Sequence, residues 1–312
     1  MSTLDKKILV TGGAGFIGSN LVDKLVADGY AVVVIDDLSS GKKYNLNPKA
    51  KLYKIDVRDK KIGDIFKKEK PEIVFHFAAQ IDIKKSVKDP IGDANTNIIG
   101  SINILENCRG FGVKKIVFAS SAAVYGKTEV FPTSESYAEC PASPYGIGKL
   151  TTEKYLAYYY KNFSLNYVSL RFANVYGPRQ DEKGEAGVVA IFCGKILSGK
   201  SPIIFGNGKQ TRDFIYVKDV VESAIFAMKT DKSGIFNIGT GKETDINNVF
   251  EIIKRASGRE CEKLYKADKE IGQQRSCLDC LKAERQLEWR VKYNFEDGLR
   301  ETVAWFKKII KR

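Results

Sequence analysis

The sequence predicts an α/β protein built on a doubly wound parallel sheet, with a smaller C-terminal part attached to it. Three observations lead to this fold class. Short runs rich in Val, Ile and Leu alternate with helical stretches through the first half of the chain. These runs are almost continuously apolar, as expected for parallel strands that are buried on both faces. After about residue 171 the pattern becomes irregular, and loops such as YGPRQDEKGEAG and FGNGKQTRDF interrupt shorter elements.

Each element is expected from its own pattern. A strand over 6–12 leads into a helix over 15–28, and further strands are expected over 31–36, 51–56, 72–79, 114–121 and 166–173. Helices are expected between these strands, including one that carries Tyr145. The amphipathic stretch NFEDGLRETVAWFKKIIKR predicts a closing helix. We therefore expect a first domain over 1–173, to which a segment near 212–240 returns, and a second domain over 174–312.

The 312-residue chain is 43% hydrophobic and 29% charged, which is typical of a soluble globular protein. No apolar run approaches the ~18 residues of a membrane span. The N-terminal stretch enters a strand pattern without a signal peptide, so we expect a cytoplasmic protein and no membrane partner. The net charge is +13, but no basic-aromatic stripe stands out. We expect a solvated lysine-rich surface and no nucleic-acid partner, although a positive field also attracts an anionic substrate.

Six cysteines are scattered along the chain. Cys277 and Cys280 form a C-x-x-C motif, a spacing that also occurs in redox and zinc sites. A structural zinc ion needs four ligands, and the chain has one histidine, His76, and no second C-x-x-C. We therefore expect reduced thiols at a chance spacing and no metal.

The stretch VTGGAGFIGSN follows the first expected strand and opens the first expected helix. Gly12, Gly15 and Gly18 form a G-x-x-G-x-x-G pattern, in which glycines let the backbone turn tightly and approach a pyrophosphate at the helix N-terminus. The second strand ends at Asp36, whose carboxylate can bind both ribose hydroxyls and would repel the 2′-phosphate of NADP. The pattern predicts NAD; a purely structural glycine loop is the alternative.

The other candidate cofactor residues lie next to this loop or at strand ends, where small side chains let a dinucleotide pass close to the backbone. Plain strand packing is the alternative for several of them. The set comprises Phe16, Ile17, Asp37, Ser40, Asp56, Val57, Phe77, Ala78, Ala79, Gln80, Ser120 and Val175.

The reactive groups are expected at the end of the fifth strand and on the helix that follows it. FASSAAVYG places Ser121 at the carboxyl edge of the sheet, where doubly wound folds bind ligands. Tyr145 and Lys149, four positions apart in SPYGIGKL, share one face of a helix. A nearby ammonium group and a positive nicotinamide ring would lower the pKa of the phenol, so that Tyr145 could accept a proton near neutral pH. An aromatic residue and a charge on an ordinary helix are the alternative.

With these motifs and with LRFANVYGPRQ and QTRDFIYVKDV, the chain resembles the extended short-chain dehydrogenase/reductase family over essentially its whole length. It is most similar to nucleotide-sugar epimerases of the UDP-glucose 4-epimerase type. The resemblance implies a Rossmann-type NAD-binding domain, a substrate-binding domain, and NAD that stays tightly bound and is regenerated in each cycle. It also implies a UDP-sugar substrate and a homodimer, formed by a four-helix bundle of the 89–108 region and the helix that carries Tyr145.

Residue roles follow from the same resemblance. Ser121, Tyr145 and Lys149 match the catalytic set, and Tyr145 and Lys149 also contact the cofactor, as does Asn97. The implied substrate contacts, besides Ser121 and Tyr145, are Asn174 and Arg212 on the diphosphate, Phe205 at uracil, Val188 and Val189 over the nucleotide, Arg275 on phosphate and Ser276 beside the sugar. Lys269 stands where the family form has an arginine, which departs from the common pattern around Arg275.

The residues after Ser121 distinguish between reactions. Family members that dehydrate the sugar carry an Asp-Glu pair there, and decarboxylases carry a glutamate, whereas this chain has Ala122 and Ala123. With no acid or base for a further step, the oxidised sugar can only be reduced again. We therefore predict C4 epimerisation of a UDP-hexose, with N-acetylated sugars also accepted because Ser276 leaves room. Another nucleotide-sugar epimerase or a reductase remains the alternative, with a non-catalytic NAD-binding protein a more distant one.

Overall fold

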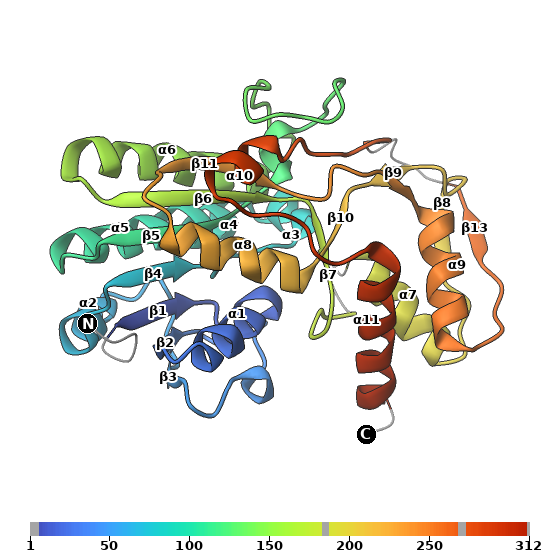
Figure 1. Cartoon of the computed structure of the whole chain (residues 1–312), viewed down its shortest axis with the longest axis horizontal. Coiled ribbons are helices and arrows are strands. Elements are labelled where there is room, and N and C mark those ends of the chain that lie inside the picture. The colour runs from blue at the N-terminus through green and yellow to red at the C-terminus, as the bar shows by residue number, and fades with distance from the viewer. Residues whose placement is uncertain (1–5, 183–186, 268–272, 311–312) are drawn as a thin grey trace.

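The computed structural model describes residues 6–182, 187–267 and 273–310. Its centre is a seven-stranded sheet of order β11-β6-β5-β4-β1-β2-β3, in which all neighbouring strands are parallel. The strands are β1 (Lys7–Thr11), β2 (Ala31–Ile35), β3 (Lys51–Tyr53), β4 (Ile73–His76), β5 (Lys115–Ser121), β6 (Asn166–Phe172) and β11 (Gly234–Ile238). The predicted doubly wound parallel sheet is confirmed (Figure 1).

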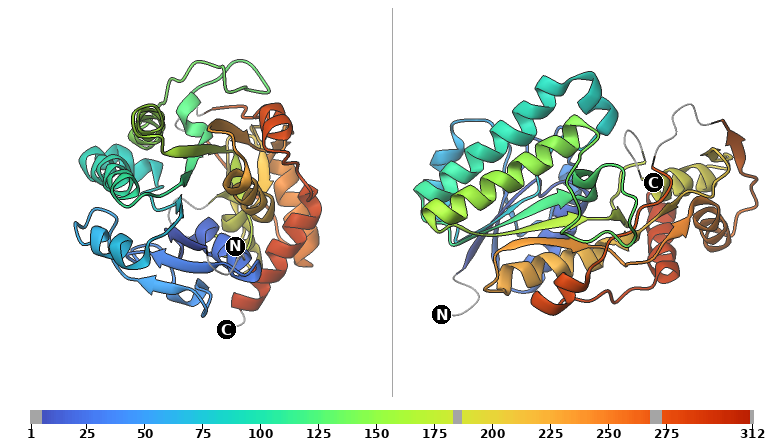
Figure 2. Two further views of the ribbon diagram at one scale, coloured as in Figure 1. Left: turned by 60° about the vertical axis from the view of Figure 1, so that its left-hand side comes forward. Right: turned by 90° about the horizontal axis from the view of Figure 1, so that it is seen from above.

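Helices cover both faces of this sheet. Side chains alternate between the two faces along each strand, so the apolar strands present apolar side chains on both sides. On β1, Ile8 and Val10 pack in a core shared with α1 and α8, whereas Leu9 packs in a core shared with α2, α5 and α6. Figure 2 shows α5 and α6 side by side on one face and α8 on the other. The bounds of these helices are α1 (Phe16–Ala27), α2 (Ile62–Glu69), α5 (Gly100–Gly110), α6 (Pro144–Phe163) and α8 (Val217–Lys229).

The strands differ from the expected ranges in two respects. β3 ends at Tyr53 and β4 at His76, earlier than the expected 56 and 79, so the residues beyond them form loops at the carboxyl edge. The pattern does not predict β11, because GIFNI is short and carries Asn237 in its interior. Asn237 is fully buried, but its side chain accepts a hydrogen bond from Tyr125 Oη and donates one to Thr133 O, which compensates its burial.

Most of the remaining elements form a smaller lobe beyond one end of the sheet (Figure 1). Three helices enclose a separate apolar core that includes Phe192, Phe250 and Phe306. These are α7 (Val188–Leu197), α9 (Ile246–Ser257) and α11 (Phe295–Ile310), the last being the predicted closing helix. Three two-stranded sheets complete the lobe and its junction with the main sheet: β7 (Asn174–Tyr176) with β10 (Phe214–Tyr216), β8 (Ile203–Phe205) with β13 (Leu264–Lys266), and β9 (Thr211–Arg212) with β12 (Thr244–Asp245).

Short helical pieces connect the larger elements. α3 (Ile83–Lys88), α4 (Pro90–Ala94) and a π-helical turn (Asn95–Ile99) lead into α5, and α10 (Leu281–Gln286) packs beside β11. Within the described residues no helix combines the length and the apolar character needed to cross a membrane.

Candidate active site

The glycine loop fits tightly between the end of β4 and the start of α1. Gly12 has φ +70°, and a Cβ atom there would lie 2.6 Å from the backbone nitrogen of Ala78. A Cβ atom on Gly18 would lie 2.1 Å from the carbonyl oxygen of Gly12. Gly12 is therefore required for both its left-handed backbone conformation and its small size, and Gly18 is required for its small size. The loop backbone thus reaches the carboxyl edge of the sheet without side chains in the way.

The first helix is suited to bind an anion. Gly15 occupies its N-cap position, no side chain caps the helix, and its first turn contains no acidic residue. The backbone N–H groups of the first turn therefore remain available, and they lie at the positive end of the helix dipole. The glycine cradle and this N-terminus fit the pyrophosphate of a dinucleotide. Phe16 and Ile17 begin the helix and are half-buried.

Asp36 is held at the end of β2 against the glycine loop. Its Oδ2 atom accepts a hydrogen bond from Ala14 N at 2.9 Å, and its Oδ1 atom accepts one from Leu38 N at 2.8 Å. Burial raises the pKa of Asp36, while these two donors act in the opposite direction. The carboxylate is therefore fixed where the second strand meets the loop, as expected for a ribose-binding acid. Asp37 instead turns away, and its Oδ1 atom accepts hydrogen bonds from the N–H and the hydroxyl of Ser39.

The other predicted cofactor residues occupy the same edge of the sheet or its borders. Asp56 follows β3 and pairs with Arg58, which lowers the pKa of this carboxyl. Phe77, Ala78, Ala79 and Gln80 follow β4 and are half-buried, Val57 is buried, Val175 lies on β7, and Ser40 is exposed.

A buried hydrogen-bond chain links the glycine loop to α5. Thr11 Oγ1 accepts from the backbone N–H groups of Phe77 and Ala78, so its own hydrogen points to His76 Nδ1, 2.8 Å away. Ser101 Oγ donates to Asn97 O and therefore accepts from His76 Nε2, 2.9 Å away. His76 is thus a neutral imidazole with its hydrogen on Nε2. Asn97 in turn pairs with Gln80, with its Oδ1 atom accepting from Gln80 N and its Nδ2 atom donating to Gln80 O, both at 2.9 Å.

This chain makes stability depend on pH through His76. Burial, with a smaller contribution from the charge of Lys149, lowers the pKa of His76 from 6.5 to about 3. The unfolded chain binds a proton at His76 below about pH 6.5 and the folded chain does not, so stability present above that pH is lost as the pH falls towards 3. Between pH 6 and 4 the free energy of unfolding should fall about 1.4 kcal/mol per pH unit more steeply in the wild type than in His76→Gln. Urea unfolding of both proteins at several pH values measures this difference, and parallel curves would contradict it.

The predicted reactive residues come together at the carboxyl edge of β5. Ser143 caps α6 by accepting a hydrogen bond from Gly146 N at 3.2 Å, and Pro144 begins the helix. This start directs one face of α6, with Lys149, onto β5, where its Nζ atom donates to Ala119 O at 2.7 Å and lies 4.8 Å from the ring centre of Phe118. Burial lowers the pKa of Lys149 to about 8, and Asp93 and Glu153 act in the opposite direction.

The expectation that Lys149 lowers the pKa of Tyr145 is wrong for the protein alone. Burial raises the pKa of Tyr145 to about 12, although a hydrogen bond with Ser121 acts in the opposite direction. The ammonium group of Lys149 is turned towards Ala119 and lies 5.8 Å from the ring centre of Tyr145, so burial outweighs it. A base at Tyr145 therefore needs a further positive charge, of the kind that an oxidised nicotinamide ring carries.

The two residues that follow Ser121, Ala122 and Ala123, have no side-chain group that can transfer a proton. Ser121 Oγ accepts a hydrogen bond from Ala123 N at 3.1 Å and caps the short turn over Ala122–Tyr125. Ser120 is buried on β5, and its Oγ atom has no hydrogen-bond partner among the described residues.

Glu243 pairs with one of the two predicted phosphate-binding arginines, Arg275, and contacts Thr211, the residue before the other, Arg212. Arg275 forms a bidentate ion pair with this carboxylate, at 2.5 Å from Nη2 to Oε1 and 3.0 Å from Nε to Oε2. Glu243 also accepts a hydrogen bond from Thr211 Oγ1, next to Arg212 on β9. Burial lowers the pKa of Arg212, whose Nη1 atom donates to Thr211 O at 2.7 Å. The structure thus brings both guanidinium groups to one region of the smaller lobe.

Asp213 is a residue of this region that the sequence analysis missed. It is fully buried, and it accepts hydrogen bonds from Thr240 N at 2.8 Å, Thr240 Oγ1 at 2.6 Å and the backbone N–H groups of Gly241 and Leu278 at 3.2 Å. It therefore ties two loops to the strand that carries Arg212. The signal in the sequence that could have identified Asp213 is its position between Arg212 and the apolar run FIY. The nearby thiols of Cys277 and Cys280 are free and buried.

The other predicted substrate contacts are more dispersed. Asn174 is exposed at the start of β7, and its backbone N–H donates to Asp213 O. Val188 and Val189 begin α7, Phe205 is exposed on β8, and Ser276 is half-buried. Lys269 lies outside the described residues. The roles of these residues remain predictions.

Known proteins share this arrangement over nearly the whole chain. Residues 8–239 match the model of the NAD dependent epimerase/dehydratase family. A putative UDP-glucose 4-epimerase of Methanocaldococcus jannaschii is 46% identical over 301 residues, covering 96% of this chain and 98% of that protein. UDP-glucose 4-epimerase from Thermotoga maritima, solved with UDP-glucose, is 47% identical with a TM-score of 0.95, covering 97% of this chain and 99% of that chain. The Thermus thermophilus UDP-glucose 4-epimerase complex with NAD is 40% identical with a TM-score of 0.91, covering 96% and 99%.

Proposed function

The chain belongs to the NAD-dependent epimerase/dehydratase family, and we propose that it is an isomerase that inverts C4 of a UDP-hexose with NAD as cofactor. The observation that carries this proposal is the composition of the site at the end of β5. Ser121, Tyr145 and Lys149 meet there, at the same edge of the sheet as the glycine loop, and Ala122 and Ala123 provide no acid or base for elimination or decarboxylation.

In the proposed reaction, Tyr145 Oη accepts the proton of the sugar 4-hydroxyl while Ser121 Oγ holds the same oxygen. NAD, when bound, supplies the hydride acceptor for C4 and the source of the returning hydride. The charge of Lys149, together with the positive charge of an oxidised nicotinamide ring, would favour phenolate over the neutral phenol that burial favours in the protein alone. Arg212 and Arg275 are suited to hold the diphosphate, because a planar guanidinium matches its paired oxygens. The 4-keto sugar rotates about this anchor and presents its other face, and Tyr145 returns the proton.

Incubation of purified protein with UDP-galactose tests the proposal directly. We expect UDP-glucose to form without added NAD, because the cofactor is regenerated in each cycle and stays bound. Failure to convert any UDP-hexose would exclude epimerisation. Net consumption of NADH or NADPH would identify the alternative, a one-way reductase, and cofactor binding without turnover would identify a non-catalytic protein.

Substrate range depends on Ser276, which we propose lies beside the sugar C2 substituent. A serine leaves room for an N-acetyl group, so UDP-N-acetylglucosamine is also a proposed substrate. Ser276→Tyr should lower kcat/KM for UDP-N-acetylglucosamine relative to UDP-galactose by about tenfold or more, because the larger side chain fills that space. Rates with the two substrates measure this ratio. An unchanged ratio would place the N-acetyl group elsewhere.

We propose a homodimer through an exposed apolar face on α4–α6. This face consists of Ile91 on α4, Ile99 on the π-helical turn that leads into α5, and Ile147, Tyr155 and Tyr158 on α6. Each of these five side chains is between 37% and 75% exposed. Positions 147, 155 and 158 follow helical spacing, and α5 and α6 pack side by side. Two such faces would bury each other as a four-helix bundle, which accounts for apolar side chains that otherwise contact water.

Light scattering checks this interface. The wild type should have about twice the 34.8 kDa mass of the chain, and Tyr155→Lys should shift the protein towards the monomer because it places a charge in the apolar contact. Tyr44→Lys is the matched control, since Tyr44 is 81% exposed and lies outside the face. Equal masses for wild type and Tyr155→Lys would place the interface elsewhere.

A cytoplasmic location and the division into a domain over 1–173, to which a segment near 212–240 returns, and one mainly over 174–312 are further parts of the proposal. All six cysteines are free thiols, which is typical of a reducing compartment.

A further inference from the structure

A buried ion pair joins α6, the helix that carries Tyr145 and Lys149, to β6, the strand next to edge strand β11. Glu153 on α6 is 1% exposed and Arg171 on β6 is 0% exposed. Arg171 Nε donates to Glu153 Oε1 at 3.0 Å, and Arg171 Nη2 donates to Glu153 Oε2 at 2.6 Å. Ser169, two positions earlier on β6, donates its hydroxyl hydrogen to Glu153 Oε1 at 3.0 Å. Three hydrogen bonds thus fix one carboxylate from two points of a rigid strand.

The position of this pair relates it to the reactive groups. Tyr145, Lys149 and Glu153 are spaced four residues apart, so they lie on one face of α6 in successive turns. On the sheet, Arg171 is the register partner of Ser120, the residue before Ser121. The ion pair therefore connects α6 to the sheet one turn beyond Lys149 and at the level of the strand-end serines.

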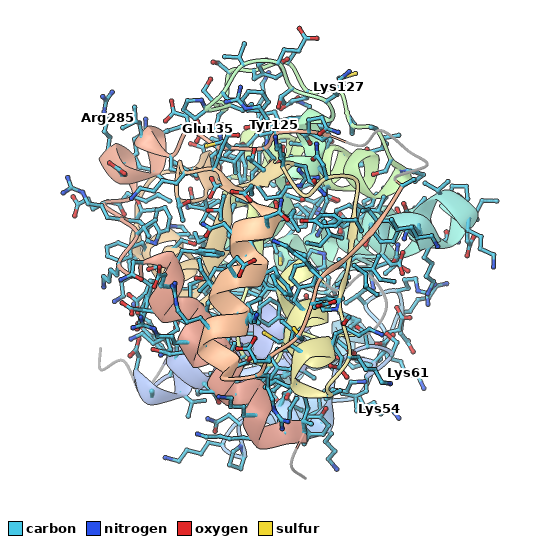
Figure 3. All side chains as sticks on the ribbon, turned by 90° about the vertical axis from the view of Figure 1, so that its right-hand side faces the viewer. Lys54, Lys61, Tyr125, Lys127, Glu135 and Arg285 are labelled. Atoms are coloured by element: carbon cyan, nitrogen blue, oxygen red, sulfur yellow. The ribbon has the colours of Figure 1, made fainter. Side chains whose placement is uncertain are left out.

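The surroundings of Arg171 extend the connection towards the loops near Arg275. The guanidinium carbon lies 4.8 Å from the ring centre of Tyr125, whose hydroxyl donates to Asn237 Oδ1 at 2.7 Å. The backbone N–H of Asn237 donates to Glu135 Oε1, and its side-chain amide donates to the backbone oxygen of Asp279. Figure 3 shows Tyr125 and Glu135 close together at the same end of the molecule. The pair is therefore part of a continuous polar network, not an isolated contact.

Stability alone does not account for such a pair. Removing two charges from water costs several kcal/mol for each ion, and apolar residues of similar size are often as stable or more stable. Its placement in the turn after Lys149 indicates a role in the site. We propose that Glu153 is a positioning residue, which through its ion pair with Arg171 holds Lys149 and Tyr145 in place against Ser121. This inference rests on the proposed function, because it assigns Glu153 a part in the same proton transfer.

The charge of Glu153 supports this role. Lys149 is buried, and the carboxylates that act on it are Asp93 from α4 and Glu153 from α6 itself. β4 contributes His76, which is neutral, and β6 contributes Arg171, whose charge is shared by Glu153 and Glu139. Glu153 is therefore one of two negative groups that keep the Lys149 amine protonated in a buried place. Removal of this charge lowers the pH at which Lys149 loses its proton.

Glu153→Gln tests the proposal because it keeps the shape of the side chain and removes its charge. At pH 8 we expect kcat for UDP-galactose epimerisation to fall about tenfold or more with KM changed less than about twofold. The alkaline limb of the kcat–pH profile should move to lower pH by about one unit. Glu153→Asp keeps the charge and should keep the alkaline limb near its wild-type position. Glu139→Gln is the matched control, because it removes the other carboxylate that pairs with Arg171. Glu139 is not among the groups that shift the pKa of Lys149, so this variant should also leave the alkaline limb in place.

A paired variant separates positioning from folding. Glu153→Gln leaves Arg171 with less compensation and should lower the thermal midpoint. Glu153→Gln/Arg171→Gln removes both charges, so it should recover the midpoint but not kcat or the alkaline limb. Recovery of wild-type kcat and pH profile in this double variant would overturn the proposal, because the pair would then be only structural. If the single variant does not fold, the double variant supplies the same test.

A substrate-free measurement keeps this inference separate from the proposed function. Tyrosinate absorbance of the NAD-loaded protein, with the spectrum of Tyr145→Phe subtracted, reports the ionisation of Tyr145. In Glu153→Gln this ionisation should move to higher pH, because Lys149 loses its charge earlier. If Tyr145 ionises at the same pH in Glu153→Gln as in the wild type, the role of Glu153 is overturned. If the ionisation shifts in Glu153→Gln but the wild type does not convert UDP-hexoses, only the proposed reaction is contradicted.

Discussion

Tyr145→Phe will lower kcat of UDP-hexose epimerisation by about 10²–10⁴-fold, the usual range for loss of a positioned proton acceptor. The substitution removes only the phenol oxygen, which is the atom that would take the proton from the sugar 4-hydroxyl. The ring stays packed beneath Lys149 and the glycine loop is untouched, so NAD should remain bound. Conversion of UDP-galactose under saturating conditions measures the effect, and the cofactor content of the purified variant shows that the binding site is intact.

Tyr160→Phe is the matched control for this change. Tyr160 is on the same helix, is 46% exposed and lies outside the site, so removal of its hydroxyl should leave kcat near the wild-type value. A Tyr145→Phe enzyme with more than about a tenth of wild-type kcat would assign the proton transfer to another group.

Gly12→Ala should raise the Kd for NAD by about 10²-fold and lower activity with it. Two costs add at this position. A left-handed backbone costs an L-residue about 1–2 kcal/mol, and the new Cβ atom would lie 2.6 Å from Ala78 N, in a backbone that cannot move aside as a side chain can. Together they amount to about 3 kcal/mol. The free protein can relieve this strain by displacing the loop, so NAD binding has to restore the strained geometry, and a cost of about 3 kcal/mol on binding is close to a hundredfold in affinity. Titration of NAD-depleted protein measures the Kd.

Gly29→Ala separates the two costs. Gly29 has φ +86°, and a Cβ atom there would have nothing within 4 Å. It should lose about 1–2 kcal/mol of stability through the backbone alone and retain wild-type affinity for NAD. If Gly12→Ala bound NAD as tightly as Gly29→Ala does, the glycine loop would not carry the cofactor.

The fold was largely predictable because its signals are local. Strands buried on both faces read as apolar runs, and the first helix begins and ends at glycine and aspartate positions that the pattern marks, Gly15 and Asp28. β11 was not predictable in the same way. Its polar residue Asn237 is satisfied by Tyr125 and Thr133, which are more than a hundred positions away in sequence, so no local pattern reveals that a polar side chain is compatible with burial there.

In the candidate site, too, local patterns predicted some features and contacts between distant residues determined the others. Spacing alone brought Tyr145 and Lys149 to one helix face, and the glycine pattern located the loop that Gly12 and Gly18 form. Electrostatics did not follow from spacing, because the pKa of Tyr145 depends on how much protein surrounds it and on where the Lys149 amine is directed. Asp213 and Arg171 were missed for a related reason. Their contacts are made with residues from distant segments, and a single acid or arginine in an apolar stretch does not reveal those contacts.

The two faces of α6 restrict how this protein can evolve. One face holds Lys149, Thr152, Glu153 and Leu156 in the interior, and the other presents Ile147, Tyr155 and Tyr158 outward. Because a helix is a stiff rod, a substitution that alters the outward contact also displaces the groups on the inward side. If α6 forms the proposed dimer contact, selection on assembly and selection on chemistry act on different residues of the same helix. We expect a change of sugar specificity to be tolerated more easily in the loops of the smaller lobe, such as those held by Asp213, because those loops are not part of α6.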